Sequence, residues 1–506
     1  MMKSNAIFNS GANGLAFFIS TISSILVRTY FINTLGVEIL GLDSLFASIF
    51  LVLAFAELGL GSAVTFALYK PLENRDFGTA KSILNLLASF YRYVIVAILI
   101  LGVLSSFLIQ FITDVDLKIE HYQYFVVYIV AGSTTFLFAE YKALALASHL
   151  NYIESIGRLI FLIIKSGLQL IAIIFYESYL LFLFSTVLAN IGMALLLRYI
   201  MLSKIPEIAL IKPRDLDLDL KQRIFRNLKG GIYHRLGSVV VTGTDNILIS
   251  IFSGAVSLGL YSSYSMIFSQ LVGFLSQLIY PLSSTIGQAK ASGKPGLILK
   301  YFEFIFCVYS FFVTVTTVGF YFCLNDLISI WLGNEYVLPN NIATFLSINM
   351  FIILMRKPSI ICIDSLGLTW QIRHKSLVEA CLNLVISLYL LVVFNMGVEG
   401  VILGTICSNI LTNLWWEPYV LYKYSFLIGL KHYFFMYGRV VINNAIIISI
   451  GIFLFDYFPI VTDLYTFLQK CLSIIFYVSV VYIALNLNFY SSRNFFSLIK
   501  SRSSSV

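Results

Sequence analysis

Long apolar runs alternate with short polar stretches along the whole chain. The apolar runs are roughly 20 residues long, which is enough for a helix to cross about 30 Å of hydrocarbon. The pattern therefore predicts an all-α integral membrane protein with about fourteen transmembrane helices. The predicted spans are 12–33, 40–66, 82–111, 122–142, 152–176, 178–200, 232–252, 257–280, 298–322, 341–363, 375–394, 398–421, 434–458 and 464–488.

Composition supports this prediction. Of the 506 residues, 59% are hydrophobic and only 11% are charged, whereas soluble domains carry about 25% charged residues. A chain this long and this apolar lacks the polar surface that a water-soluble globule needs. The six cysteines are scattered without a C-x-x-C spacing, so they are interpreted as small apolar residues and not as metal ligands.

Basic residues mark the orientation of the chain. If the N-terminus is cytoplasmic, the outer connections contain a single basic residue, Lys118, whereas the inner connections hold many lysines and arginines. This alternation follows the positive-inside rule. It predicts a multi-pass membrane protein with both termini in the cytoplasm. The net charge of +8 then reflects topology, and no nucleic-acid partner is expected.

Two segments repeat at a fixed offset of 218 residues. Residues 36–50 and 254–268 share Gly36/Gly254 and Gly41/Gly259, among other matches, and each copy precedes an inbound helix. Chance similarity in an apolar background is the alternative. A repeat at equivalent points of the topology favours two six-helix lobes. The expected division is an N-terminal lobe at 1–201, a cytoplasmic linker with a short amphipathic helix at 202–231, a C-terminal lobe at 232–424, and two extra helices with a cytoplasmic tail at 425–506.

Several segments resemble a known transporter family. They are LGVEILGLDSLFASIFLVLAFAELGLGSAVTFALYKPL (35–72), TDNILISIFSGAVSLGLYSSYSMI (244–267), GVEGVILGTICSNI (397–410) and WWEPYVLYK (415–423). Over nearly its whole length the chain resembles the Wzx-type flippases, the polysaccharide branch of the MOP superfamily, whose members have a MATE-like fold.

The resemblance implies a two-lobed, V-shaped protein that works by alternating access. It would move an undecaprenyl-diphosphate-linked oligosaccharide from the inner to the outer leaflet, for capsule, O-antigen or exopolysaccharide assembly. The implied partners are this lipid-linked oligosaccharide, membrane lipids, a polymerase and other polysaccharide-assembly proteins.

Cations inside the predicted spans are the candidate head-group contacts. A charged side chain at membrane depth costs at least ~2.5–3.5 kcal/mol, so each needs a partner or a function. A diphosphate also needs compensating charge in hydrocarbon, and the arginine fork binds phosphate bidentately. The predicted contacts are Arg28, Lys165, Arg235 and Arg356.

Each of these cations has a structural alternative. Arg28 is placed to pair with Asp43 across an outer turn, and Lys165 to pair with an acid on a neighbouring helix. Arg235 is close enough to a predicted span end to snorkel to the inner surface. Arg356 lies two residues before Pro358, so its alternative role is to mark a kinked helix end.

Acids and aromatic residues complete the candidate site. No ATP-binding motif is found, because GQAKASGKP (287–295) has the wrong glycine spacing for a P-loop. An ion gradient, the membrane potential or product removal would then drive transport. Asp43, Glu57 and Asp245 are candidates for H⁺ or Na⁺ coupling or for charge pairing, and Tyr261 and Tyr264 for sugar stacking, with helix packing as the alternative. No other cofactor and no metal site is predicted.

Two other classes of function were weighed. A membrane-embedded polysaccharide polymerase or ligase needs a large outer loop with catalytic residues, but the longest outer connection, 323–341, has no basic residue and no histidine. The chain is therefore predicted not to be an enzyme. A MATE-like, cation-coupled drug exporter has the same architecture but favours an acidic cavity, whereas this chain places cations at depth.

Overall fold

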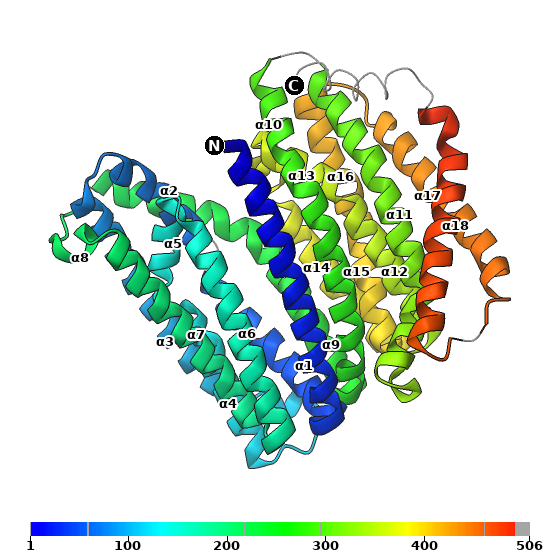
Figure 1. Ribbon diagram of the computed structural model, residues 1–506, viewed down its shortest axis with the longest axis horizontal. Coiled ribbons are helices and arrows are strands. Elements are labelled where there is room, and N and C mark those ends of the chain that lie inside the picture. Colours follow the sequence, from blue (N-terminus) through cyan, green and yellow to red (C-terminus); the bar gives the residue numbers. More distant parts are fainter. Residues whose placement is uncertain (1, 58–59, 217, 294–295, 460, 491–506) are drawn as a thin grey trace. The chain divides into compact units, whose positions relative to one another are not determined.

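The computed structural model describes residues 2–57, 60–216, 218–293, 296–459 and 461–490. Side chains are described for these residues except 2–13, 15, 56–57, 60–63, 218–221, 223–242 and 487–490. All regular secondary structure in the described residues is helical (Figure 1). The all-α membrane fold predicted from the apolar runs is thus confirmed.

The chain forms two compact units, Met1–Ser262 and Ser263–Val506. The boundary between them lies inside the long helix α9 (Leu218–Ile279). Compact units and ancestral repeats need not share a boundary, so the division into lobes at 1–201 and 232–424 stays a prediction.

The first unit contains helices α1 to α8, the short helices η1 to η3 and the first part of α9. Helix α6 packs along α7 and α1, and α2 packs on α3 and α5. The elements are α1 (Met2–Leu53), η1 (Ala54–Glu57), α2 (Leu60–Glu73), α3 (Phe77–Ser106), η2 (Ile109–Phe111), α4 (Ile119–Ser133), η3 (Thr134–Phe136), α5 (Ala139–Ala147), α6 (Asn151–Tyr176), α7 (Tyr179–Lys204), α8 (Glu207–Leu210) and the first part of α9.

In the second unit, α11 packs on α12 and α18, and α15 packs on α12 and α14. Its elements are the rest of α9, η4 (Tyr280–Leu282), α10 (Ser283–Ala291), α11 (Leu297–Trp331), η5 (Asn334–Tyr336), α12 (Asn340–Met355), α13 (Lys357–Leu366), η6 (Thr369–Ile372), α14 (Lys375–Phe394), α15 (Gly397–Leu411), α16 (Asn413–Leu421), the π-helix η7 (Tyr422–Phe426), α17 (Lys431–Phe455) and α18 (Leu464–Tyr490).

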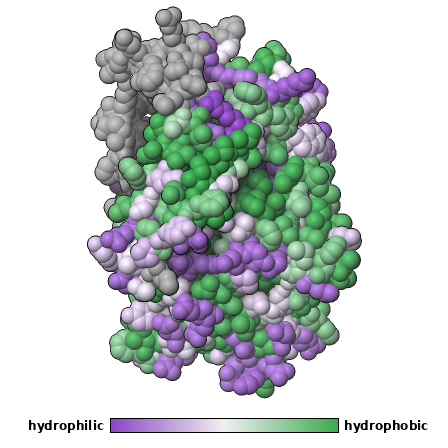
Figure 2. Space-filling view, turned by 90° about the vertical axis from the view of Figure 1, so that its right-hand side faces the viewer, coloured by the Kyte–Doolittle hydropathy of each residue, from purple (hydrophilic) through white to green (hydrophobic). Residues whose placement is uncertain are grey.

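The exposed surface suits a lipid environment. Figure 2 shows one face of the molecule, on which hydrophobic residues form broad patches and hydrophilic residues gather toward the lower edge. Large apolar side chains of α17 and α18, including Phe453, Leu472 and Phe476, are exposed. Helices that expose such side chains are stable in hydrocarbon but not in water.

Twelve stretches of the described residues are long and apolar enough to cross a membrane. Two of them, Ala16–Leu53 and Gly243–Ala291, contain a glycine with a non-helical backbone: Gly36 (φ 85°, ψ 169°) and Gly254 (φ 84°, ψ 167°). Such dihedral angles favour glycine and interrupt a helix. When each interrupted stretch is counted as two segments, the total agrees with the fourteen spans predicted.

The two repeats touch each other reciprocally within the first unit. A Cβ atom added to Gly41 would clash with the Ala255 carbonyl oxygen, and one added to Gly259 would clash with the Val37 carbonyl oxygen. At the offset of 218 residues, Gly41 corresponds to Gly259 and Val37 to Ala255. The shared glycines therefore permit two equivalent close approaches of backbone to backbone, as expected of segments related by a pseudo-two-fold axis.

The predicted linker rests on the start of α3. Asp76 caps this helix by accepting a hydrogen bond from the Thr79 amide at 3.0 Å, and hydrogen bonds from Thr79 lower the pKa of Asp76. The Lys81 ammonium donates to the carbonyl oxygens of Ala209 (2.9 Å) and Ile211 (2.7 Å). The linker contains the four-residue α8, and residues 218–231 form the start of α9, so the amphipathic helix expected there stays a prediction.

Candidate functional site: two clusters of intramembrane charge

Three predicted site residues come together in the first unit. Arg28 and Asp43 lie on α1, before and after Gly36, and Lys165 lies in the middle of α6. The Asp43 carboxylate interacts electrostatically with both cations and accepts a hydrogen bond from the Tyr179 hydroxyl at 2.7 Å. We call Arg28, Asp43, Lys165 and Tyr179 the first-unit cluster. At their usual ionisation states, Arg28, Lys165 and Asp43 sum to one positive charge.

Arg28 does not form the direct ion pair with Asp43 that the sequence allowed. Its Nη1 donates to the Ser262 hydroxyl at 2.9 Å, on the second repeat. At the equivalent position of that repeat, Asn246 donates through Nδ2 to the Ser48 hydroxyl, also at 2.9 Å. Each of these two hydrogen bonds links one repeat to the helical segment that precedes the other repeat. Only the bond from Arg28 brings a positive charge.

Lys165 shares its acidic neighbour with Arg28. Among the described side chains, its ammonium has no carboxylate within ion-pair distance, and its electrostatic partner is Asp43. Helices α1 and α6 pack together, so Asp43 is the acid on a neighbouring helix that the sequence suggested for Lys165. One carboxylate serves both cations, which leaves donor capacity on each.

Aromatic residues surround this carboxylate. The Tyr179 ring lies edge-on to Tyr124 at 5.0 Å and is stacked with Phe182 at 5.9 Å, and Tyr128 interacts electrostatically with Asp43. Sequence reasoning missed Tyr179, because a tyrosine at the start of a span carries no special signal. Only the packing of α7 against α1 identifies it.

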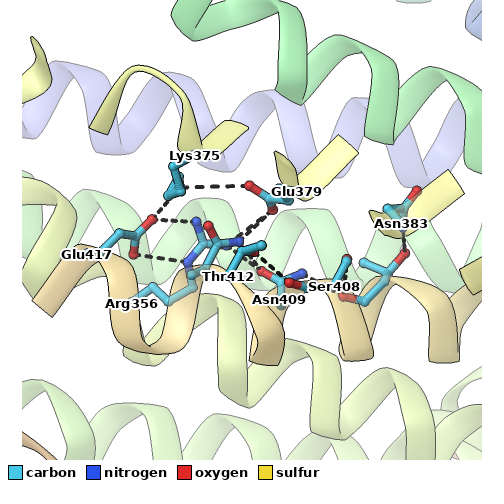
Figure 3. A network of polar contacts seen from close by, with 10 residues as sticks. Arg356, Lys375, Glu379, Asn383, Ser408, Asn409, Thr412 and Glu417 are labelled. Carbon is cyan, nitrogen blue, oxygen red and sulfur yellow. Dashed lines mark hydrogen bonds and ion pairs between the residues drawn. The ribbon is translucent and has the colours of Figure 1, made fainter. Parts of the chain in front are cut away.

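Arg356 belongs to a different kind of site in the second unit (Figure 3). Its Nη2 and Nε donate to the two carboxylate oxygens of Glu417 at 2.7 and 3.1 Å, so the pair is bidentate. The Lys375 ammonium binds the same carboxylate at 2.6 Å. Glu379 lies 3.7 Å from Lys375 and 3.9 Å from Arg356. We call Arg356, Lys375, Glu379 and Glu417 the second-unit cluster.

Amides complete the second-unit cluster. Asn409 Oδ1 accepts from Arg356 Nη1 at 2.5 Å, and Asn413 Nδ2 donates to Glu379 at 2.6 Å. The four charged side chains are between 1% and 15% exposed. Within ion-pair distance two cations face two anions, and Lys357 is a further electrostatic neighbour of Arg356 and Glu417.

The second-unit cluster lies where membrane helices are broken. Arg356 separates α12 from α13 just before Pro358, and Glu417 follows the interruption at Thr412 (φ −120°, ψ −69°) between α15 and α16. The sequence interpretation that Arg356 marks a kinked helix end therefore agrees with the structure. The predicted contact between Arg356 and a diphosphate does not agree with the structure, because Glu417 and Asn409 already bind the guanidinium of Arg356.

Sequence reasoning missed the partners of Arg356. Glu379 and Glu417 lie within the predicted spans 375–394 and 398–421, so the cost of a charge at membrane depth was the signal that could have found them. Lys375 is the first residue of the predicted span 375–394, where a lysine is typical of a span end, yet its side chain is only 6% exposed and is ion-paired.

The remaining predicted residues are scattered. Asp245 and Tyr261 are electrostatic neighbours on α9. Tyr264 is fully buried; its hydroxyl donates to Asn325 Oδ1 at 2.8 Å and accepts from the Leu338 amide at 2.9 Å. This is the helix-packing alternative, so Tyr264 is not placed to stack on a sugar here. The side chains of Glu57 and Arg235 lie outside the described residues.

No protein-family model and no curated protein matches the sequence. Solved structures do match the fold. An inward-facing multidrug resistance MATE family transporter of the MOP superfamily matches with a TM-score of 0.65 at 13% identity, covering 80% of this chain and 96% of that one. The lipid II flippase MurJ, in an inward closed conformation, matches with a TM-score of 0.67 at 15% identity, covering 94% and 98%. A mutant of the Vibrio cholerae MATE transporter VcmN matches with a TM-score of 0.57 at 15% identity, covering 82% and 96%. The chain is thus a multi-pass membrane protein with the fold of the MOP-superfamily transporters and flippases.

Proposed function

We propose that the protein is a Wzx-type flippase, which moves a diphosphate-linked lipid carrying an oligosaccharide from the inner to the outer leaflet of a bacterial plasma membrane. The lipid-linked product would serve capsule, O-antigen or exopolysaccharide assembly. The observation that carries the proposal is the surplus positive charge of the first-unit cluster, in which Arg28 and Lys165 share Asp43 as their acidic neighbour. The likeness in fold to MurJ, a lipid II flippase, is consistent with a lipid cargo.

The chemistry of the cluster suits a diphosphate. The guanidinium of Arg28 has five N–H donors, of which one is used by Ser262, and the ammonium of Lys165 has three. Charge-assisted hydrogen bonds from these groups would replace water around the phosphate oxygens, which cannot cross hydrocarbon unpaired. Arg235 stays in the proposal as a further contact. Arg356 is withdrawn from it, because Glu417 already holds its fork.

A MATE-like exporter of cationic drugs is the alternative on the same fold. A cationic drug would meet repulsion from Arg28 and Lys165, and only one carboxylate of the cluster would attract it. The sign of the charge on the preferred ligand therefore separates the two functions.

Binding and translocation test the proposal directly. Purified protein should bind farnesyl diphosphate at least ten times more tightly than farnesol, and should not bind the cationic dye ethidium. In the host, loss of the protein should leave lipid-linked oligosaccharide in the cytoplasmic leaflet. Ethidium binding without farnesyl diphosphate binding, or normal surface polysaccharide in a deletion strain without a second exporter, would overturn the proposal.

A further inference from the structure

Helix α6 has polar side chains along one side of a membrane span, in two groups between which Leu162 lies on the same side; Gln169, at the far end, is buried and donates to Thr186. At 100° per residue, its polar side chains fall within about 120° of the helix circumference. The stripe consists of Asn151, Glu154, Ser155, Arg158, Lys165, Ser166 and Gln169. Another side of the helix exposes apolar side chains, among them Ile156, Ile163 and Ile171.

The two sides of α6 need different surroundings. The isoleucines are compatible with acyl chains. The stripe is not, because Arg158, whose side chain is 68% exposed, and Lys165 would be costly to hold against hydrocarbon. A spanning helix with one polar face borders water or a polar ligand on that face.

One end of the stripe opens into a groove of about 380 Å³. Asn151 and Glu154 line it, together with Tyr91 of α3 and Lys142 of α5. The segment between α4 and α5 contributes Thr135 and Phe136 to its wall, and in the same segment Leu137 is extended and Phe138 has φ 55°. Non-helical backbone at membrane depth is tolerated where it is buried in protein or lines a cavity, and in transporters such breaks often adjoin a binding site.

The groove has the chemistry of a site for a hydroxyl-rich, uncharged ligand. The Tyr91 ring stacks with Phe136, with centroids 6.0 Å apart and planes 14° apart, and Phe136 lines the groove. Around this apolar wall are a carboxylate, an amide, an ammonium and the Thr135 hydroxyl. Aromatic faces pack against the C–H faces of sugar rings, and these polar groups donate to and accept from sugar hydroxyls. The Glu154 carboxylate also pairs with Arg158 of the same helix, at 3.8 Å.

The groove and the cationic cluster share α6. Glu154 and Lys165 are eleven residues apart, about three helical turns, so they face the same way at a distance of about 16 Å along the axis. We propose that the groove is a glycan subsite and that the polar stripe of α6 connects it to the diphosphate contacts. This inference rests on the proposed function and assigns the sugar end of the cargo to Tyr91, Lys142, Asn151 and Glu154.

Two soluble probes test the glycan subsite. The first is farnesyl diphosphate and the second is farnesyl diphosphate extended with a disaccharide of N-acetylglucosamine. Wild-type protein should bind the glycosylated probe about tenfold more tightly than the first. Glu154→Gln and Asn151→Ala should each remove this difference without changing the affinity for farnesyl diphosphate, whereas Lys165→Ala should weaken both. Glu207→Gln, on the exposed α8, is the matched control.

Labelling of cysteine variants tests the stripe without any ligand. In a variant with all six native cysteines replaced, single cysteines at Ser155 and Ser166 should react with a charged methanethiosulfonate at least ten times faster than cysteines at Ile156 and Ile163. Equal rates would show that the stripe does not border water.

The outcomes separate the inference from the function on which it rests. If wild type binds neither probe, the proposed function fails. If it binds both probes equally, or if Glu154→Gln and Asn151→Ala leave the difference intact, the function survives and the glycan subsite is wrong.

Discussion

The two units hold their intramembrane charges in different ways. In the second-unit cluster, Arg356 and Lys375 contact Glu417 at 2.7 and 2.6 Å, so each of these cations has a carboxylate in direct contact. In the first-unit cluster, Arg28 and Lys165 share Asp43, whose carboxylate is hydrogen-bonded to Tyr179. The second-unit cluster has satisfied its charges within the protein, and the first-unit cluster has not.

This difference distinguishes two pairs of cations. Among the described side chains, Arg356 and Lys375 are in direct ion pairs, whereas Arg28 and Lys165 are not. In a buried ion pair with short bidentate contacts the charge of the cation is already compensated by the protein, and the pair holds together the helices that supply it. A cation that shares a distant carboxylate still gains from an added anion. Under the proposed function, the balance of neighbouring charges distinguishes candidate ligand contacts from structural cations better than depth in the membrane does.

The largest effect is expected from removing the central acid of the second unit. Glu417→Gln leaves Arg356 and Lys375 buried without their closest anion, which should lower the free energy of unfolding by about 3–5 kcal/mol. Glu379→Gln is the matched control and should cost less, because its contacts are 3.7 and 3.9 Å long. Thermal unfolding in detergent measures both. Equal losses, or no loss for Glu417→Gln, would mean that the cluster does not hold the broken helices together.

The next effect concerns ligand binding by the first unit. Lys165→Ala should weaken farnesyl diphosphate binding about 10- to 100-fold, since a hydrogen bond to a charged group contributes about 1.5–3 kcal/mol. Arg28→Ala should act similarly, and neither should impair membrane insertion. Isothermal titration measures the change. Unaltered affinity in both variants would remove the first-unit cluster from the proposed site.

The sequence alone predicted the fold and three residues of the first-unit cluster. Apolar run length and the asymmetry of basic residues predicted the helices, because both follow from the cost of polar groups in hydrocarbon. The same cost identified Arg28, Asp43 and Lys165 as residues that need partners. The same reasoning made Arg356 a candidate ligand contact, although Arg356 is ion-paired with Glu417.

The rest depended on which helices pack together. Arg356 and Glu417 are 61 residues apart, and no periodicity shows that the break after α12 meets α16. Tyr179 reaches Asp43 across 136 residues, so its role follows only from the packing of α7 near α1. The polar stripe of α6, by contrast, can be seen in the sequence as polar residues at helical spacing. Only the structure shows that its first residues line a groove together with residues between α4 and α5.

Asp43→Asn should have the opposite consequence to Glu417→Gln. Removing this carboxylate leaves Arg28 and Lys165 without their shared anion but breaks no short ion pair. We expect little change in thermal stability and about tenfold tighter binding of farnesyl diphosphate, equivalent to about 1.4 kcal/mol. Tighter binding should also slow release and reduce translocation. A loss of stability as large as that of Glu417→Gln would contradict the distinction between the clusters.

The smallest effect tests how Asp43 is held. In Tyr179→Phe the carboxylate loses the hydroxyl that donates to it at 2.7 Å, while the ring stacked with Phe182 stays. Without that donor, the Asp43 carboxylate should draw Arg28 and Lys165 into direct contact, so an incoming diphosphate competes less well for them. We expect farnesyl diphosphate to bind about fivefold more weakly, corresponding to about 1 kcal/mol for one hydrogen bond. In the Asp43→Asn background the same substitution should change binding much less, because the competing carboxylate is gone. Additive effects in the double variant would indicate that Tyr179 contacts the ligand itself and does not act through Asp43.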